Sequence, residues 1–115
     1  MALQTQTVQQ TSQTLKLLGD YNRLRMMQFI YERECCVCEL VELINLSQPA
    51  ISQHLRKLRD GGLVMEQRKG SWVFYRMNED HTTFNLMKEI LQSLPSVQSE
   101  LDELEQDGLN VICHK

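Results

Sequence analysis

Apolar residues in the first part of the chain recur at the three- to four-residue spacing of amphipathic helices. The spacing predicts a first helix over residues 2–18, a second from the cap residue Asp20 to about Arg33, and a short third over residues 37–45. The first of these is rich in Gln and Thr and has few apolar positions, so it needs a partner surface to be stable. A frayed polar arm is the alternative for residues 2–18.

A fourth helix is predicted from Ser47, a typical N-cap, with Pro49 in the first turn, where its missing N–H costs nothing. The pair Gly61-Gly62 ends this helix. Its apolar side chains fall at i, i+4 and i+7, which places them on one inward face: Ile51, Leu55 and Leu58. The opposite face is left to polar side chains.

Beyond these glycines the period changes from helical to alternating. Residues 63–68 and 72–77 are predicted strands, and Lys69-Gly70-Ser71 between them is a glycine-containing hairpin turn. The helical period returns over residues 79–106, with a heptad-like seam that Pro95 should kink or divide: Ile90, Leu94, Val97, Leu101 and Leu104. We interpret this seam as a dimerisation surface, and the alternative is a helix that packs on its own core.

The order of these elements predicts the fold class: mainly α with a two-stranded β wing, a winged helix-turn-helix. Residues 1–115 are expected to form a single domain that assembles as a homodimer. Within it, residues 2–18 and 79–106 are the expected dimerisation helices, residues 37–60 the helix-turn-helix, and residues 63–77 the β-hairpin wing.

A chain of 115 residues with 42% hydrophobic residues is sufficient for one modest core. No apolar run approaches the roughly 18 residues of a membrane span, and the N-terminus lacks the features of a signal peptide. Three of the four cysteines crowd into residues 35–38, unlike the spread spacing of a secreted domain with structural disulfides. We therefore expect a cytoplasmic protein with reduced thiols and no membrane partner.

The formal net charge of −3 is unevenly distributed along the chain. Residues 47–77 contain six Lys or Arg against two acids, whereas residues 78–107 contain one Lys against eight acids. Positive charge concentrated in one stretch is typical of a nucleic-acid footprint. Because this stretch coincides with the fourth helix and the hairpin, double-stranded operator DNA is the expected partner.

Polar side chains on the outer face of the fourth helix suit a DNA groove. Gln can hydrogen-bond an adenine edge through two atoms, Ser and His reach bases or phosphates, and Arg and Lys neutralise phosphates. The candidate DNA-binding residues on this helix and at the wing tip are Ser47, Gln48, Ser52, Gln53, His54, Arg56, Lys57, Arg68 and Lys69. The alternatives are a solvated charged face and, for His54, a capping or packing role.

A cluster of thiols, Cys35, Cys36 and Cys38, lies at the start of the third helix. A helix N-terminus stabilises thiolates, so we expect lowered pKa values and metal binding. Soft thiolates without nearby His favour trivalent arsenic or antimony, with cadmium, lead and copper(I) as competitors. In a regular helix Cys36 and Cys38 point about 200° apart and cannot share an ion, whereas Cys35 and Cys38 come closer. We hypothesise that chelation distorts the third helix, which supports the fourth.

Two stretches of the chain resemble the ArsR/SmtB family of metal-responsive bacterial repressors. They are Ser47-Gln48-Pro49-Ala50-Ile51-Ser52-Gln53-His54-Leu55-Arg56-Lys57-Leu58-Arg59-Asp60-Gly61-Gly62-Leu63-Val64 and Arg68-Lys69-Gly70-Ser71-Trp72-Val73-Phe74-Tyr75-Arg76, within a resemblance that covers roughly residues 15–80. It implies a dimer with terminal helices at its interface, which binds an inverted-repeat operator and releases it when an inducer binds.

The stretch Cys36-Val37-Cys38-Glu39-Leu40 is similar to the Cys-Val-Cys-Asp-Leu box of arsenic-sensing members of that family. Their third thiol follows three residues after the second, where this chain has Val41. Cys35 and Cys113 are the candidate substitutes for the third metal ligand. The resemblance implies arsenite or antimonite as the inducer and no permanently bound cofactor.

Other functions stay open at this point. A cadmium-, lead- or zinc-responsive repressor, or a thiol redox or persulfide sensor, would use the same fold. A thiol oxidoreductase would use the Cys-x-x-Cys spacing, but the βαβ surroundings of that motif are absent, so we expect no enzymatic activity. A winged helix used only for protein contacts would have no operator affinity.

Overall fold

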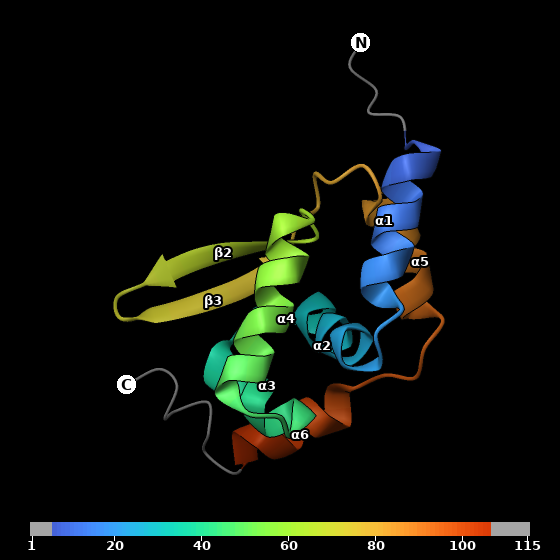
Figure 1. The fold of residues 1–115 in the computed structure, drawn as a ribbon. Coiled ribbons are helices and arrows are strands. Elements are labelled where there is room, and N and C mark those ends of the chain that lie inside the picture. Colours follow the sequence, from blue (N-terminus) through green and yellow to red (C-terminus); the bar gives the residue numbers. More distant parts are fainter. Residues whose placement is uncertain (1–5, 107–115) are drawn as a thin grey trace.

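The computed structural model describes residues 6–106 as a body of helices with a small antiparallel sheet at one side (Figure 1). The elements in chain order are α1 (Val8–Leu18), α2 (Tyr21–Glu32), β1 (Cys35–Cys36), α3 (Val37–Ile44), α4 (Gln48–Asp60), β2 (Val64–Lys69), β3 (Trp72–Met77), α5 (Phe84–Gln92) and α6 (Gln98–Gln106). The predicted fold class is confirmed: α3 and α4 form the helix-turn-helix, and β2 and β3 form the wing. None of the described helices is long and apolar enough to cross a membrane.

Side-chain caps explain where α2 and α4 begin. The carboxylate of Asp20 accepts a hydrogen bond from the backbone N–H of Arg23 (3.0 Å), and Ser47 Oγ accepts one from the N–H of Ala50 (3.3 Å). At the end of α3, Asn45 takes the left-handed conformation (φ 63°), which stops the helix and turns the chain toward α4. The local sequence therefore sets the turn between the two helices.

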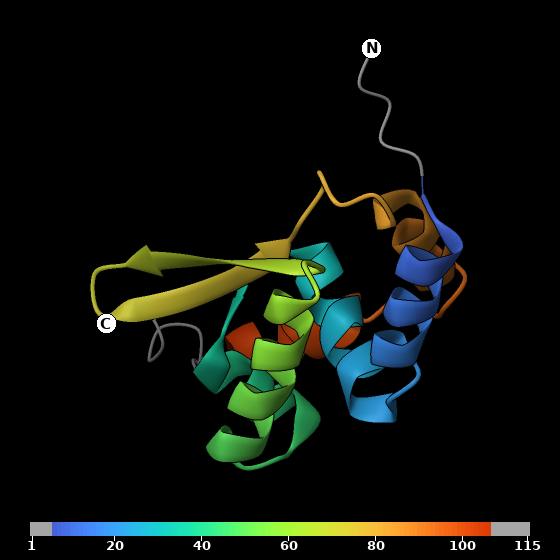
Figure 2. The ribbon, with the colours of Figure 1, turned by 45° about the horizontal axis from the view of Figure 1, so that its top comes forward.

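The sheet has three strands in the order β1-β3-β2, all paired antiparallel. The predicted hairpin closes at Gly70, whose φ of 64° suits glycine. The strand β1 was not predicted. It pairs Cys35 with Tyr75 and Cys36 with Phe74, and a two-residue strand is too short to show an alternating pattern. Figure 2 shows the hairpin of β2 and β3 extending from the helices on the side away from α1.

The helix α2 is the centre of the core and contacts α1, α3, α4, α5 and β3. Its side chains Met26, Met27 and Phe29 are completely buried. The predicted inward stripe of α4 is confirmed, because Ile51, Leu55 and Leu58 are also completely buried: all three belong to the same apolar cluster. This packing anchors α4 by one face and leaves the other face to solvent.

The predicted helix over residues 79–106 is divided into α5 and α6 by the segment that contains Pro95. Val97, Leu101 and Leu104 are buried within the protomer, and α6 packs against α3. These three seam positions therefore follow the alternative of a helix that packs on its own core, and the assignment of residues 79–106 as a dimerisation helix stays a prediction. The three positions complete the protomer's own core, because the break at the proline lets α6 fold back underneath α3 (Figure 1).

Candidate nucleic-acid interface and thiol cluster

The candidate DNA-reading residues lie along the outer side of α4. Gln48, Gln53, Arg56 and Lys57 are exposed, whereas Ser52 is half-buried. Within residues 6–106, neither Arg56 nor Lys57 forms an ion pair, so both charges face solvent. The N-cap Ser47 is exposed, and its hydroxyl is already used to hold the first turn of the helix.

His54 lies on the flank of α4 that faces α2. Its Nδ1 is 3.3 Å from Nη1 of Arg23, and Nε of the same arginine donates to the carbonyl of Leu17 (2.8 Å). Burial lowers the pKa of His54 below its ordinary value, and the nearby arginine acts in the same direction. His54 therefore has a packing contact within the protomer, the alternative that the sequence left open for it.

The opposite flank of α4 is tied to the wing through Arg59, which was not among the predicted residues. Its guanidinium pairs with Glu66 on β2 (3.2 Å) and with Asp60 (3.2 Å). The phenol of Tyr75 donates a second hydrogen bond to Glu66 (2.7 Å). These contacts bridge α4, β2 and β3, and they hold the base of the wing against the reading helix.

The two predicted wing residues differ in their surroundings. Arg68 and Lys69 are both exposed on β2. The ammonium group of Lys69, however, pairs with Glu34 and lies 5.0 Å from the centroid of the Phe74 ring. The structure thus connects Lys69 to the residue that immediately precedes the cysteine cluster.

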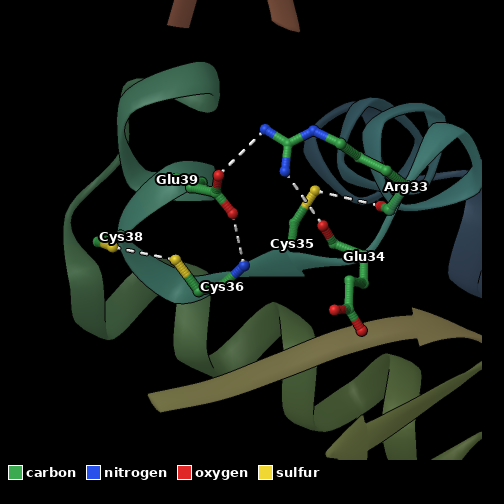
Figure 3. Close-up of polar contacts among 6 residues, drawn as sticks. All are labelled: Arg33, Glu34, Cys35, Cys36, Cys38 and Glu39. Atoms are coloured by element: carbon green, nitrogen blue, oxygen red, sulfur yellow. Dashed lines mark hydrogen bonds and ion pairs between the residues drawn. The ribbon is translucent and has the colours of Figure 1, made fainter. Parts of the chain in front are cut away.

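The cysteines lie at the junction of β1 and α3: Cys35 and Cys36 form the strand, and Cys38 is in the helix. The sequence had predicted all three at the start of one helix. Cys36 is the N-cap of α3 and is extended (φ −91°, ψ 167°). Its Sγ lies 3.0 Å from Sγ of Cys38, as the dashed line between the two in Figure 3 shows. The 200° separation calculated for a regular helix therefore does not apply to Cys36 and Cys38, because only Cys38 is inside the helix.

Cys35 points away from this sulfur pair. Its thiol donates to the backbone carbonyl of Arg33 (3.4 Å), on the side facing α2 (Figure 3). Neighbouring residues of a strand project to opposite faces, which explains why Cys35 joins the main core while Cys36 packs with Phe74. Within the described part of the chain, no group of three or more candidate ligands comes together, and Cys113 lies outside that part.

The buried carboxylate of Glu39 holds the turn in place. One oxygen accepts the backbone N–H of Cys36 (2.9 Å), and the other accepts Nη2 of Arg33 (3.0 Å). Arg33 also donates to the carbonyl of Glu34 (3.3 Å). This role of Glu39 was not predicted from the sequence. Its position three residues after the N-cap, as in a capping box, was the signal that could have found it.

The pKa values of the buried thiols are raised, contrary to the expectation of stabilised thiolates. Burial raises the pKa of Cys35 to about 12 and that of Cys36 to about 11. The negative charge of Glu39 raises both further. Desolvation and a neighbouring carboxylate therefore outweigh the field of the helix N-terminus, and both thiols are protonated at neutral pH.

Comparison with known proteins places these features in a family. The pattern of the family described as "Bacterial regulatory protein, arsR family" matches residues 20–66. The chain is 34% identical over 79 residues to an arsenical resistance operon repressor of Bacillus subtilis, which covers 68% of this chain and 75% of that protein. The chain belongs to the arsR family. An arsenic resistance transcriptional regulator of Pseudomonas putida is 50% identical over 66 residues, or 56% of this chain.

The match to the Pseudomonas protein spans about half of its length (52%). Among solved structures, reduced HlyU from Vibrio cholerae matches with a TM-score of 0.66 at 28% identity. The match covers 73% of this chain and 87% of the HlyU chain. The transcriptional repressor BigR from Xylella fastidiosa has a TM-score of 0.65 at 30% identity, with coverage of 76% and 89%. The family is described as one of regulatory proteins, and the Pseudomonas, Bacillus and Xylella proteins are named as transcriptional regulators or repressors.

Replacing Glu39 should cost this arsR-family protein more stability than its place in the first turn of a short helix suggests. Glu39→Ala leaves the Cys36 N–H and the Arg33 guanidinium without their acceptor. We expect a loss of about 2–4 kcal/mol in urea denaturation, less than for a fully dry ion pair because Arg33 is partly exposed. Glu39→Gln keeps an acceptor for the N–H and should lose less.

The matched control is Glu42→Ala, an exposed acid on the same helix, which should change the unfolding free energy by less than about 0.5 kcal/mol. An equal loss of unfolding free energy for the Glu39 and Glu42 variants would contradict the stabilising role of the Glu39 hydrogen bonds to Cys36 and Arg33.

The raised thiol pKa values predict a shifted pH dependence of alkylation. Only the thiolate reacts with iodoacetamide, and its fraction falls tenfold for each unit by which pH lies below the pKa. Relative to the ordinary pKa of 9.0, Cys36 at about 11 should react on the order of 100-fold more slowly at pH 8 in the folded protein than in urea. Fragment-resolved mass spectrometry assigns the modified residue.

The pH profile separates this effect from simple shielding. The rate for folded Cys36 should keep rising tenfold per pH unit above pH 9.5, whereas in urea it should level off there. A folded-state profile that levels off near pH 9 would show that the thiol is shielded but has an ordinary pKa.

Proposed function

We propose that this protein is a DNA-binding transcriptional repressor that releases its operator when trivalent arsenic or antimony binds its thiol cluster. The arrangement that carries the proposal has two parts. The exposed basic helix α4 follows α3 after one short turn, and the start of α3 holds the sulfur atoms of Cys36 and Cys38 3.0 Å apart. The relatives named as arsenic resistance regulators support the choice of ligand.

The DNA contacts follow from the exposed side chains of α4 and the wing. Gln48 and Gln53 are the proposed base-reading residues, because an amide can pair with an adenine edge through two atoms. Positively charged residues at both ends of this surface contact phosphates: Arg56, Lys57, Arg68 and Lys69. Ser47, whose hydroxyl accepts the N–H of Ala50 and can still donate its own proton, completes the surface together with Ser52. His54 supports the surface through Arg23.

A homodimer is the proposed assembly, with a second copy of this chain against α1. The side chains of Val8 and Leu15 on this helix are 88% and 49% exposed. The helix lies beside α5, and Thr14 is hydrogen-bonded to Thr83 at the start of that helix (2.8 Å). A two-fold dimer presents two reading helices, which suits an inverted-repeat operator.

The proposed inducer site consists of Cys36 and Cys38 in the reduced protein. Trivalent arsenic in water is a neutral trihydroxide. Each S–As bond forms as the thiol proton joins a hydroxide that leaves as water, so protonated thiols are suitable reactants. Cys113 or a retained hydroxide takes the third position, whereas Cys35 would first have to leave its contact with Arg33. No resident cofactor is required.

A sensor that forms a disulfide or polysulfide is the second candidate, and the short Sγ–Sγ distance favours it over a cadmium, lead or zinc site. It would need a peroxide or persulfide as oxidant, which takes two electrons while the two thiol protons are released. The two candidates differ in the reagent that releases DNA.

Operator release tests the proposal. Fluorescence anisotropy of an operator duplex, selected from randomised DNA, should show at least tenfold weaker binding with saturating arsenite. Cys36→Ser and Cys38→Ser should each abolish this response, and Cys35→Ser should largely keep it because that sulfur points elsewhere. Cadmium, zinc and a persulfide donor are parallel arms. Equal operator affinity with and without arsenite would refute arsenic sensing, and release by persulfide alone would favour the second candidate.

Phosphate contacts are tested separately from the inducer. Removing one phosphate contact should lower the slope of log affinity against log salt by about one and weaken binding to all sequences similarly. We expect this for Arg56→Ala and Lys57→Ala. Lys88→Ala, an exposed cation on α5, is the matched control and should leave the slope unchanged. The same slope for the wild type and both α4 variants would exclude this face as the DNA interface.

A further inference from the structure

We infer that the thiol cluster controls the wing directly, through β1 and Phe74, in addition to any effect on α3 and α4. The inference rests on the proposed function, since it concerns how an inducer at Cys36 and Cys38 is communicated to DNA. It differs from the hypothesis based on the sequence, in which the signal passes only along the helix-turn-helix.

The first connection is the backbone of the sheet. Cys36 pairs with Phe74 and Cys35 with Tyr75, so β1 is the edge strand that attaches the wing to the helical body. The central strand β3 is hydrogen-bonded to β1 on one side and to β2 on the other. A change in the backbone at Cys36 therefore acts on β3 without passing through α4.

The second connection is side-chain packing. Cys36 and Phe74 are buried together in a small apolar cluster of their own, with Cys38 and Trp72 packed against it. Close-packed interiors do not admit an additional heavy atom without moving their neighbours. An arsenic atom on the sulfur of Cys36 therefore competes for space with the Phe74 ring.

The third connection is electrostatic. Glu34, two residues before Cys36, pairs with Lys69 on β2, and the same ammonium group lies over the Phe74 ring. Three attachments of different physical kinds thus join residues 34–38 to the hairpin. Lys69 pairs with Trp72 beside the hairpin turn, so these attachments reach the wing tip, where Arg68 and Lys69 are proposed to contact phosphates. A change at Cys36 or Phe74 therefore acts on the tip directly.

Hydrogen exchange of the wing is the primary test. The dimeric, reduced protein without DNA is compared with and without saturating arsenite, with arsenite binding measured independently by calorimetry. We expect faster exchange of amides in β2, the strand that carries no cysteine and is not paired with β1, and little change in α5. Emission from Trp72, the one tryptophan of the chain, should change at the same arsenite concentration.

Two substitutions test whether these connections carry the signal. Phe74→Leu removes the ring beside Cys36, and Glu34→Gln removes the ion pair with Lys69. Glu34→Gln should leave arsenite affinity within about threefold of the wild type, and Phe74→Leu, which relieves the competition for space, should not weaken it. Each should also reduce, by threefold or more, the ratio of operator affinities without and with arsenite. Glu42→Gln, an exposed acid on α3 away from the wing, is the matched control and should preserve this ratio.

The outcomes distinguish the two levels of the argument. The wing connection alone is overturned if arsenite binds and causes release of DNA, but leaves β2 exchange unchanged, and both variants keep the wild-type ratio of operator affinities. If arsenite does not bind, or binds without releasing DNA, the proposed function fails and the inference fails with it. If Phe74→Leu does not fold, the exchange data and Glu34→Gln decide.

Discussion

The hydrogen bonds of one buried carboxylate hold together the part of the molecule where sensing is proposed to occur. Glu39 accepts the backbone N–H of Cys36 with one oxygen and the guanidinium of Arg33 with the other. A carboxylate without water around it needs such partners, because its desolvation is costly. The same two bonds fix where α3 begins and connect it to the end of α2. The extended conformation of Cys36, and with it the strand β1, depends on this clamp.

The chemistry of the cysteines follows from that junction of strand and helix. Adjacent strand residues face opposite ways, so Cys35 enters the main core while Cys36 turns toward Phe74, and the first helical turn brings Cys38 back beside it. Burial keeps the thiols of Cys35 and Cys36 protonated by raising their pKa values. The site is therefore a pair of closely spaced sulfur atoms next to the wing, where a regular helix would have separated them.

Although this arsR-family protein carries a net negative charge, the uneven distribution of its charged residues is consistent with DNA binding. Exposed cations of α4 and the wing lie on one part of the surface, and the acids of α6 pack near α3 on another. Charges separated by more than about 8 Å are largely screened at physiological salt, so a local basic surface matters more than the net charge.

Local sequence was sufficient for the helices, the hairpin and the reading face. Capping residues such as Ser47, the stripe of Ile51 with Leu55 and Leu58, and the change of period after the glycines all act between near neighbours. What tertiary structure decided involves partners far apart in the chain. The two-residue strand β1 exists because β3 lies beside it, and α6 buries its seam because α3 accepts it. The thiol pKa values depend on burial that no local spacing encodes.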